Sequence, residues 1–217
     1  MDYLLERFKK LDTTCVSDAM DKLGVEGGAY GIKPLHFGEK LCGRAFTVHY
    51  RPCGVETGTV GDFLDQVKPE QVIVIDNAGR CDCTVWGDIM AKTAKARGIA
   101  GTVIDGVCRD VPAILSCSYP IFSKGYYMRT GKDRVFVDAV NSPVMLSNIP
   151  VQPGDIILGD DSGVVVIPDS LADKILTIAE DIDIKEQTIL ELVAKGHSLK
   201  EARQLTGYHH LQTKEGK

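Results

Sequence analysis

The stretch WGDIMAKTAKARGIAGTVIDGVCRD, residues 86–110, decides the fold class and suggests where a site lies. Gly87-Asp88 marks a helix start, the following alanines favour a helix, its lysines can face water, and Gly98 is a typical stop. Residues 99–104 are then apolar or small, which is typical of a strand buried on both faces in a parallel sheet. The stretch therefore predicts a helix, a buried strand and a loop that ends in Arg109-Asp110.

A second apolar segment, VIVID at residues 72–76, precedes this helix and completes a strand–helix–strand unit. Such units are nearly always right-handed with parallel strands, so both strands end at the same edge of the sheet. Asp88 follows the first strand, and Arg109 and Asp110 follow the second. We therefore expect two carboxylates and one guanidinium to meet in a crevice at that edge, where open parallel sheets bind ligands.

These groups suit a metal ion and a small 2-oxo acid. Carboxylate oxygens are typical ligands of Mg²⁺ or Mn²⁺. The backbone N–H groups at the helix start, near Ile89 and Met90, can receive an anion. Arg109 can hold a carboxylate through two hydrogen bonds or stabilise an oxygen that gains charge. A structural alternative stays open, because a helix N-terminal aspartate and an Arg109–Asp110 ion pair need no ligand.

The spacing of Gly87-Asp88, twenty residues and Arg109-Asp110 resembles the signature of the RraA-like family. That family includes class II 4-hydroxy-4-methyl-2-oxoglutarate / 4-carboxy-4-hydroxy-2-oxoadipate aldolases and the regulator of ribonuclease activity A. The similarity extends from about Thr13 to Gly196, and includes SDAMDKLG, the Pro-Gly-Asp at 153–155 and GDDSGVVVIP at 159–168.

The resemblance implies a single α/β domain of the swivelling β/β/α type, with layered sheets flanked by helices. We expect this RraA-like domain to cover residues 1–196. The remaining residues, 197–217, are predicted to form a short helix, which begins with the capping-box pattern Ser198–Glu201, and a mobile tail with His209-His210.

The resemblance also implies roles for individual residues. In the aldolases, the aspartate that matches Asp110 binds the metal directly and the one that matches Asp88 acts through water. The residues that match Arg109, Gly87 and Asp88 bind the substrate. Those that match Arg109 and Asp88 are also catalytic. The amides that match Ile89 and Met90 receive the pyruvyl carboxylate.

Two further expectations concern the metal. A glutamate on the C-terminal helix of the aldolases reaches the neighbouring subunit's metal through water, and Glu186 is the nearest match here. The family pattern often has an acidic residue three positions after the Arg-Asp pair, where this chain has Ala113. That departure bears on metal affinity, because groups next to a ligand tune it. The resemblance implies a homotrimer, or a hexamer of two trimers, with the site at the subunit boundary.

The expected function is a lyase that depends on Mg²⁺ or Mn²⁺, cleaves 4-hydroxy-2-oxo acids to pyruvate and decarboxylates oxaloacetate. No lysine lies in a pattern that marks a Schiff base, which favours metal over imine chemistry. The alternative is a non-catalytic protein-binding module that resembles the ribonuclease regulator. Asp88, Arg109 and Asp110 together count against it, because a binding surface does not need a metal-binding trio.

Composition narrows the class of protein. Hydrophobic residues make up 44% and charged residues 25% of the 217, which is typical of a soluble globular protein. The formal net charge of −5 argues against nucleic-acid binding. No apolar run is long enough to span a membrane, and the N-terminus does not resemble a signal peptide. The seven dispersed cysteines are most simply reduced thiols of a cytoplasmic protein; a zinc site around Cys81 and Cys83 lacks the usual spacing.

Other helices and strands are predicted from the spacing of apolar residues and from the glycine, proline and capping residues between them. Arg80 is placed on the crossover loop, where it could bind an anion or simply face water, and glycine-rich residues 54–61 are expected at the site rim. Helices are predicted at residues 2–11 and 63–67. Two more are predicted with caps, one from Thr13, Thr14 or Ser17 to Gly24 and one from Ser170 to Lys195. Strands are predicted at 46–50, 120–122, 156–158 and 164–167, and the last two are expected to form a hairpin.

Overall fold

The computed structural model describes residues 2–55 and 58–208. Its strands are β1 (Lys33–Pro34), β2 (Leu41–Pro52), β3 (Val72–Thr84), β4 (Gly101–Cys108), β5 (Ile121–Tyr126), β6 (Val135–Val140), β7 (Val144–Leu146), β8 (Ile149–Val151), β9 (Ile156–Asp160) and β10 (Gly163–Ile167). The main sheet has eight strands in the order β1-β5-β4-β3-β2-β9-β10, with β6 also paired to β2, while β7 and β8 form a separate pair.

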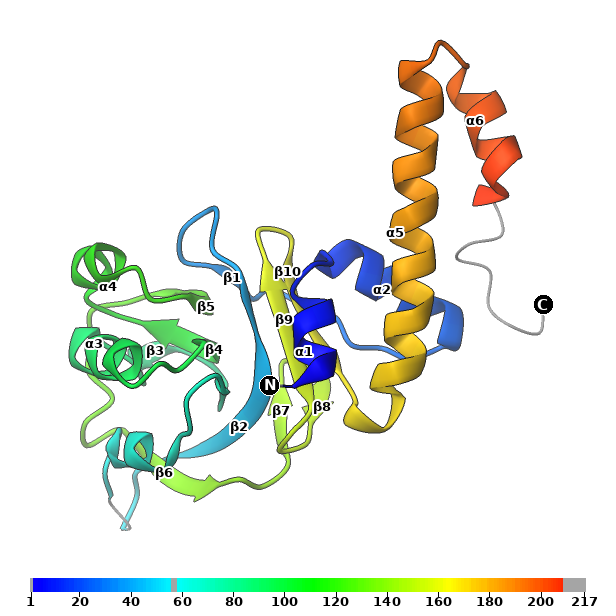
Figure 1. The fold of residues 1–217 in the computed structure, drawn as a ribbon. Coiled ribbons are helices and arrows are strands. Elements are labelled where there is room, and N and C mark those ends of the chain that lie inside the picture. The colour runs from blue at the N-terminus through cyan, green and yellow to red at the C-terminus, as the bar shows by residue number, and fades with distance from the viewer. Residues whose placement is uncertain (1, 56–57, 209–217) are drawn as a thin grey trace.

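The helices lie in two groups on either side of the strands (Figure 1). They are α1 (Tyr3–Phe8), α2 (Thr13–Leu23), α3 (Asp88–Ala96), α4 (Val111–Cys117), α5 (Ala172–Ala194) and α6 (Leu199–Thr206), with 3₁₀ turns η1 (Asp62–Gln66) and η2 (Asp169–Leu171). Helices α3 and α4 lie on one side, whereas α1, α2 and α5 lie beside β9 and β10. Helix α5 extends away from the body, and α6 folds back along it. Among the described residues, no helix is long and apolar enough to cross a membrane.

Strand β2 belongs to both halves of the sheet. Residues 41–44 pair antiparallel with β9, and residues 45–49 pair parallel with β3. Strands β2, β3, β4 and β5 are parallel neighbours, with α3 and α4 in the connections between them. The predicted mixed α/β fold, with a central sheet flanked by helices, is therefore confirmed.

The parallel strands are buried on both faces, as their uninterrupted apolar sequences predict. Ile73 and Ile75 point to the face covered by α3 and α4, where they pack in a cluster with Ala91. Val72 and Val74 point to the other face and belong to a separate cluster. All four strand residues have no exposed surface, and each such burial stabilises the fold by roughly 1.5–3 kcal/mol.

Several local predictions need correction. Strand β3 extends to Thr84, so Arg80 lies on a strand and not on the crossover loop. Helix α2 is capped by Asp12, whose carboxylate accepts a hydrogen bond from the amide of Cys15 at 2.7 Å. Ser170 lies within η2, and α5 begins at Ala172 without a side-chain cap. Helix α4 and strands β6, β7 and β8 were not predicted.

Two predictions at the C-terminal part of the chain are confirmed. The β9–β10 hairpin has the expected antiparallel pairing. Helix α6 begins with a complete capping box, in which Ser198 and Glu201 satisfy one another's backbone amides. The predicted tail with His209-His210 lies outside the described residues, so the domain division at residue 196 stays a prediction.

Candidate active site

A cavity of about 450 Å³ lies where the β3–α3 connection passes the β4–α4 connection. Residues 58–61 form part of its rim, as predicted from their glycine content. The structure brings together in this cavity the three residues that the strand–helix–strand argument selected, Asp88, Arg109 and Asp110. Gly87, Ile89 and Met90, expected from the helix start and the family resemblance, also line it.

The backbone of Asp110 has an unusual conformation that aims its carboxylate at the start of α3. Its φ of 60° and ψ of 35° are left-handed, and its side chain makes no capping bond to α4, although it occupies the N-cap position. Instead, Oδ2 accepts a hydrogen bond from the amide of Asp88 at 3.3 Å and lies 3.4 Å from Nε of Arg109. A non-glycine residue in this region costs about 1 kcal/mol or more, and such residues cluster at functional sites.

Gly87 leaves the space that this carboxylate occupies. A Cβ atom at residue 87 would lie 2.7 Å from Oδ2 of Asp110 and 3.3 Å from Nε of Arg109. The φ of −146° at Gly87 is extended and open to any residue, so the requirement is for space and not for backbone freedom. The glycine therefore lets an acidic side chain lie directly against the first turn of α3.

Asp88 provides the second carboxylate and is held by the next turn of its own helix. Nζ of Lys92 donates a hydrogen bond to its Oδ2 at 2.7 Å. This bond, followed by the positive charge of Lys92, holds the pKa of Asp88 below its usual value. Asp88 is therefore ionised at neutral and mildly acidic pH, as a carboxylate that acts on a metal must be.

Several lining residues were not predicted from the sequence. Lys132 brings a second cation to the cavity that contains Arg109, and Thr84, Trp86 and Thr130 complete its wall. A backbone hydrogen bond joins the two connections that form the cavity: the amide of Arg109 donates to the carbonyl of Trp86 at 3.0 Å. Lys132 follows β5 in a segment without regular structure, so no local sequence pattern connects it with Asp88 or Arg109.

The donor set fits a magnesium-type ion. Mg²⁺ typically takes one or two protein carboxylates and completes its shell with water and substrate oxygens. Asp88 and Asp110 supply two carboxylates, while no group of three or more acidic, cysteine or histidine side chains is placed for a metal within residues 2–55 and 58–208. Burial raises the pKa of the Cys108 thiol to about 11, and within the same residues the cysteines belong to no three-ligand group that could hold zinc.

Three other sequence candidates lie outside this cavity or beside it. Arg80 forms a two-bond ion pair with Asp82 and does not line the cavity. Glu186 lies on α5, on the far side of the sheet from α3 (Figure 1), and accepts a hydrogen bond from the thiol of Cys15 at 3.5 Å. Its contact with a neighbouring subunit stays a prediction. Ala113 lies in the first turn of α4, and its amide donates to the carbonyl of Asp110 at 3.0 Å.

Fold and cavity together define a mixed α/β protein with a polar site at the carboxyl ends of its parallel strands. Comparison with protein families agrees with this description and makes it specific. The family model described as RraA-like: Aldolase/RraA matches residues 13–166, and the chain belongs to this family.

Two relatives and one solved structure extend the comparison. Protein DlpA of Legionella pneumophila is 40% identical over 207 residues, which are 94% of this chain but 34% of that protein. A protein of Halalkalibacterium halodurans named "Putative 4-hydroxy-4-methyl-2-oxoglutarate aldolase" is 34% identical, over 87% of this chain and 90% of its own length. The crystal structure of an uncharacterized protein from Pseudomonas syringae pv. tomato has a TM-score of 0.87 and 43% identity, covering 92% of this chain and 96% of that one.

Proposed function

We propose that this protein is a divalent-metal-dependent lyase that cleaves 4-hydroxy-2-oxo acids of the 4-hydroxy-4-methyl-2-oxoglutarate type to pyruvate, and that it also decarboxylates oxaloacetate. One observation carries the proposal. The Asp110 carboxylate, a helix N-terminus and the Arg109 guanidinium meet within 3.4 Å in one cavity. The name of the Halalkalibacterium halodurans relative supports the same reaction class.

Asp110 would hold Mg²⁺ or Mn²⁺ directly, and Asp88 would reach it through water. Bound there, the cation supplies a Lewis acid for the keto oxygen of the substrate. The lowered pKa of Asp88 keeps its charge available for this role at working pH. Ala113 leaves the first turn of α4 without a further carboxylate, so water and substrate would fill the remaining positions.

The residues of the chain would bind the substrate and stabilise the charge that develops. The amides of Ile89 and Met90, at the start of α3, would receive the 1-carboxylate, because the first N–H groups of a helix have no carbonyl partner within it. Arg109 would stabilise the keto oxygen as it becomes negative. Aldol cleavage and oxaloacetate decarboxylation both break the C3–C4 bond and leave electrons on that oxygen, so one site can serve both. In aldol cleavage a water in the cavity would take the proton of the 4-hydroxyl group.

A pyruvate-release assay with EDTA and Mn²⁺ add-back tests the proposal. We expect Asp110→Asn to abolish metal-dependent turnover and Arg109→Met to lower kcat about 10²–10³-fold, as loss of an oxyanion donor does. Asp173→Asn, an exposed change on α5, is the matched control and should leave turnover unchanged. Undiminished pyruvate release by a folded Asp110→Asn variant would refute the proposal; binding to a ribonuclease complex would then favour the regulator-like alternative.

We also propose that Glu186 of a neighbouring copy completes the site, in a homotrimer or a hexamer. The two carboxylates within one chain and the exposed apolar residues Ile184 and Leu190 on the same helix support this assembly. Light scattering measures the mass of the particle. If the proposal holds, Glu186→Gln weakens Mn²⁺ binding, whereas full Mn²⁺ affinity in a monomer would contradict it.

A further inference from the structure

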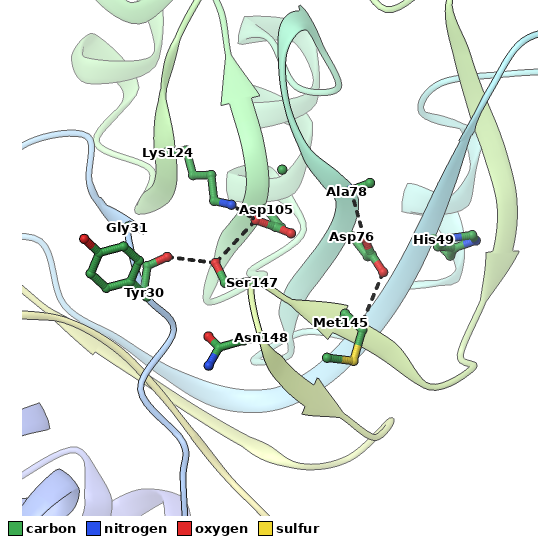
Figure 2. A pocket seen from close by; sticks show the side chains of 11 residues that line it. Tyr30, Gly31, His49, Asp76, Ala78, Asp105, Lys124, Met145, Ser147 and Asn148 are labelled. Atoms are coloured by element: carbon green, nitrogen blue, oxygen red, sulfur yellow. Dashed lines mark hydrogen bonds and ion pairs between the residues drawn. The ribbon is translucent and has the colours of Figure 1, made fainter.

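A second and larger cavity, of about 910 Å³, lies at the carboxyl ends of the parallel strands and shares no lining residue with the candidate active site (Figure 2). Four neighbouring strands each contribute one side chain to it: His49, Asp76, Asp105 and Lys124. His49 pairs with Asp76, and Asp76 pairs with Asp105, so these residues form a row across the sheet.

The row points away from helices α3 and α4. Ile75 and Ile104, the residues that precede the two aspartates, pack in the cluster that contains the apolar side chains of α3. Since successive strand residues point to opposite faces, Asp76 and Asp105 point to the other face. The cavity is therefore separate from the proposed lyase site: the two share no lining residue, and the row of polar residues points to the face of the sheet opposite α3 and α4.

The carboxylates of Asp76 and Asp105 have different hydrogen-bond and ion-pair partners. Asp76 accepts one backbone hydrogen bond on each oxygen, from Ala78 at 2.9 Å and from Met145 at 3.0 Å. Asp105 receives Nζ of Lys124 at 2.7 Å on Oδ1, and the Ser147 hydroxyl, which donates to the carbonyl of Tyr30 at 2.8 Å, lies 3.4 Å from the same oxygen. Asp105 is only 4% exposed and lines the cavity, and both of these contacts lie on the same oxygen.

The row carries more negative than positive charge, because two carboxylates share the single ammonium of Lys124. Like charges at directly paired positions of neighbouring strands destabilise a sheet, and burial strengthens their repulsion. Two carboxylates and the ammonium of Lys124 leave one negative charge in the row. The Nδ1 of His49 faces away from the aspartates of the row, 3.2 Å from Asp138, a carboxylate that also pairs with Arg51. A bound cation would offset this remaining negative charge at the two carboxylates.

The walls of the cavity favour an organic cation over a metal ion. Only two carboxylates line it, and the described residues offer no three-ligand metal group here. Its volume far exceeds the shell of a single ion. Tyr30, 85% exposed, and Met145, 42% exposed, stand at its border, and both suit the apolar body of a ligand. An aromatic ring also attracts a cation directly.

We propose that this cavity binds a small organic amine or guanidinium compound, with the charged group at Asp76 and Asp105 and the carbon body against Tyr30 and Met145. Figure 2 shows the two carboxylates on neighbouring strands, with Tyr30 to their left and Met145 below Asp76. The inference does not depend on the proposed lyase function, because neither the residues nor the ligand are shared with it.

Calorimetric titration of the full chain tests this proposal. The probes are 1,4-diaminobutane and agmatine, with 1,4-butanediol as an uncharged analogue of similar length. We expect both amines to bind and the diol not to bind. Asp105→Asn should weaken amine binding about tenfold, the loss expected for one charge-assisted hydrogen bond. Tyr30→Ala, a change of an exposed side chain, should weaken it without any effect on folding, and Asp173→Asn is the surface-charge control.

Lys124→Met gives a further test, because a purely structural role of Asp105 does not predict tighter amine binding in this variant. Removal of its ammonium frees Asp105 for the ligand, so amine binding should become several-fold tighter, with circular dichroism to check the fold. Three results would overturn the proposal: no binding of either amine, equal binding of the diol, or wild-type amine affinity in both Asp105→Asn and Tyr30→Ala. A second copy of the chain over the cavity would give the first of these results.

Discussion

Replacement of Gly87 by alanine tests whether the position of the Asp110 carboxylate determines activity. The added Cβ atom would lie 2.7 Å from Oδ2 of Asp110, whereas ordinary contact begins near 3.4 Å, so the carboxylate must retreat by about 0.7 Å. Its 3.3 Å hydrogen bond from the amide of Asp88 would then exceed the usual limit. Metal ligands tolerate errors of only about 0.2 Å. We therefore expect weaker Mn²⁺ binding and a loss of kcat/KM of about 10²-fold.

The same substitution should have little effect on folding. Residue 87 has an extended backbone that alanine adopts freely, and the atom that must move is the end of a side chain at the surface of a cavity. Alanine also restricts the unfolded chain, which stabilises the fold by about 0.4–1 kcal/mol and offsets the strain. Urea unfolding should therefore give a free energy of unfolding within about 1 kcal/mol of the wild type.

The assay couples pyruvate release to lactate dehydrogenase, with Mn²⁺ affinity measured in parallel. Gly28→Ala is the matched control, because a Cβ atom there meets nothing within 4 Å, its φ is not left-handed and it does not line the site. Wild-type turnover and Mn²⁺ affinity in a folded Gly87→Ala protein would refute the reasoning, since the carboxylate position would then be irrelevant to the reaction.

Other predictions concern pH, metal affinity and the core. Lys92→Met should let the pKa of Asp88 rise, so the acid limb of the kcat/KM profile moves to higher pH; an unmoved limb would contradict this role for Lys92. In the wild type, stabilisation by this pair is present above the unfolded pKa of Asp88 and is lost as the pH falls through the lowered folded value. Ala113→Glu should tighten Mn²⁺ binding about tenfold by calorimetry, and unchanged affinity would show that residue 113 does not tune the metal. Phe122→Ala should cost about 3–5 kcal/mol in urea unfolding, because Phe122 is fully buried, and a loss below 1 kcal/mol would contradict tight packing there.

The strand–helix–strand unit was predictable because its signals are local and strong. Residues 72–75 are all apolar and those at 99–104 are apolar or small, while Gly87-Asp88 and Gly98 mark the start and end of the helix between them. Parallel pairing with a right-handed crossover then brings Asp88 and Asp110 together whatever the remaining chain does. The RraA-like signature predicts the same residues for one site, and the family match confirms the family.

Other features depend on contacts that no short segment encodes. Strand β3 continues past Asp76 through a register shift, with Ala78 at a φ of 52°, so its second half does not alternate as an ordinary strand would. Helix α4 has seven residues, too few for a periodic pattern, and Pro112 near its start resembles a turn signal. Lys132 reaches the cavity through long-range packing, which residue order alone does not reveal.

The length of strand β2 affects how the sheet of this protein opens. One continuous backbone serves β9 with residues 41–44 and β3 with residues 45–49. A slip of one residue would turn Phe46 and Val48 out of their cluster and misplace both halves together. Because both strands pair with this one strand, we expect amide exchange in β9 and β3 to report a shared opening event.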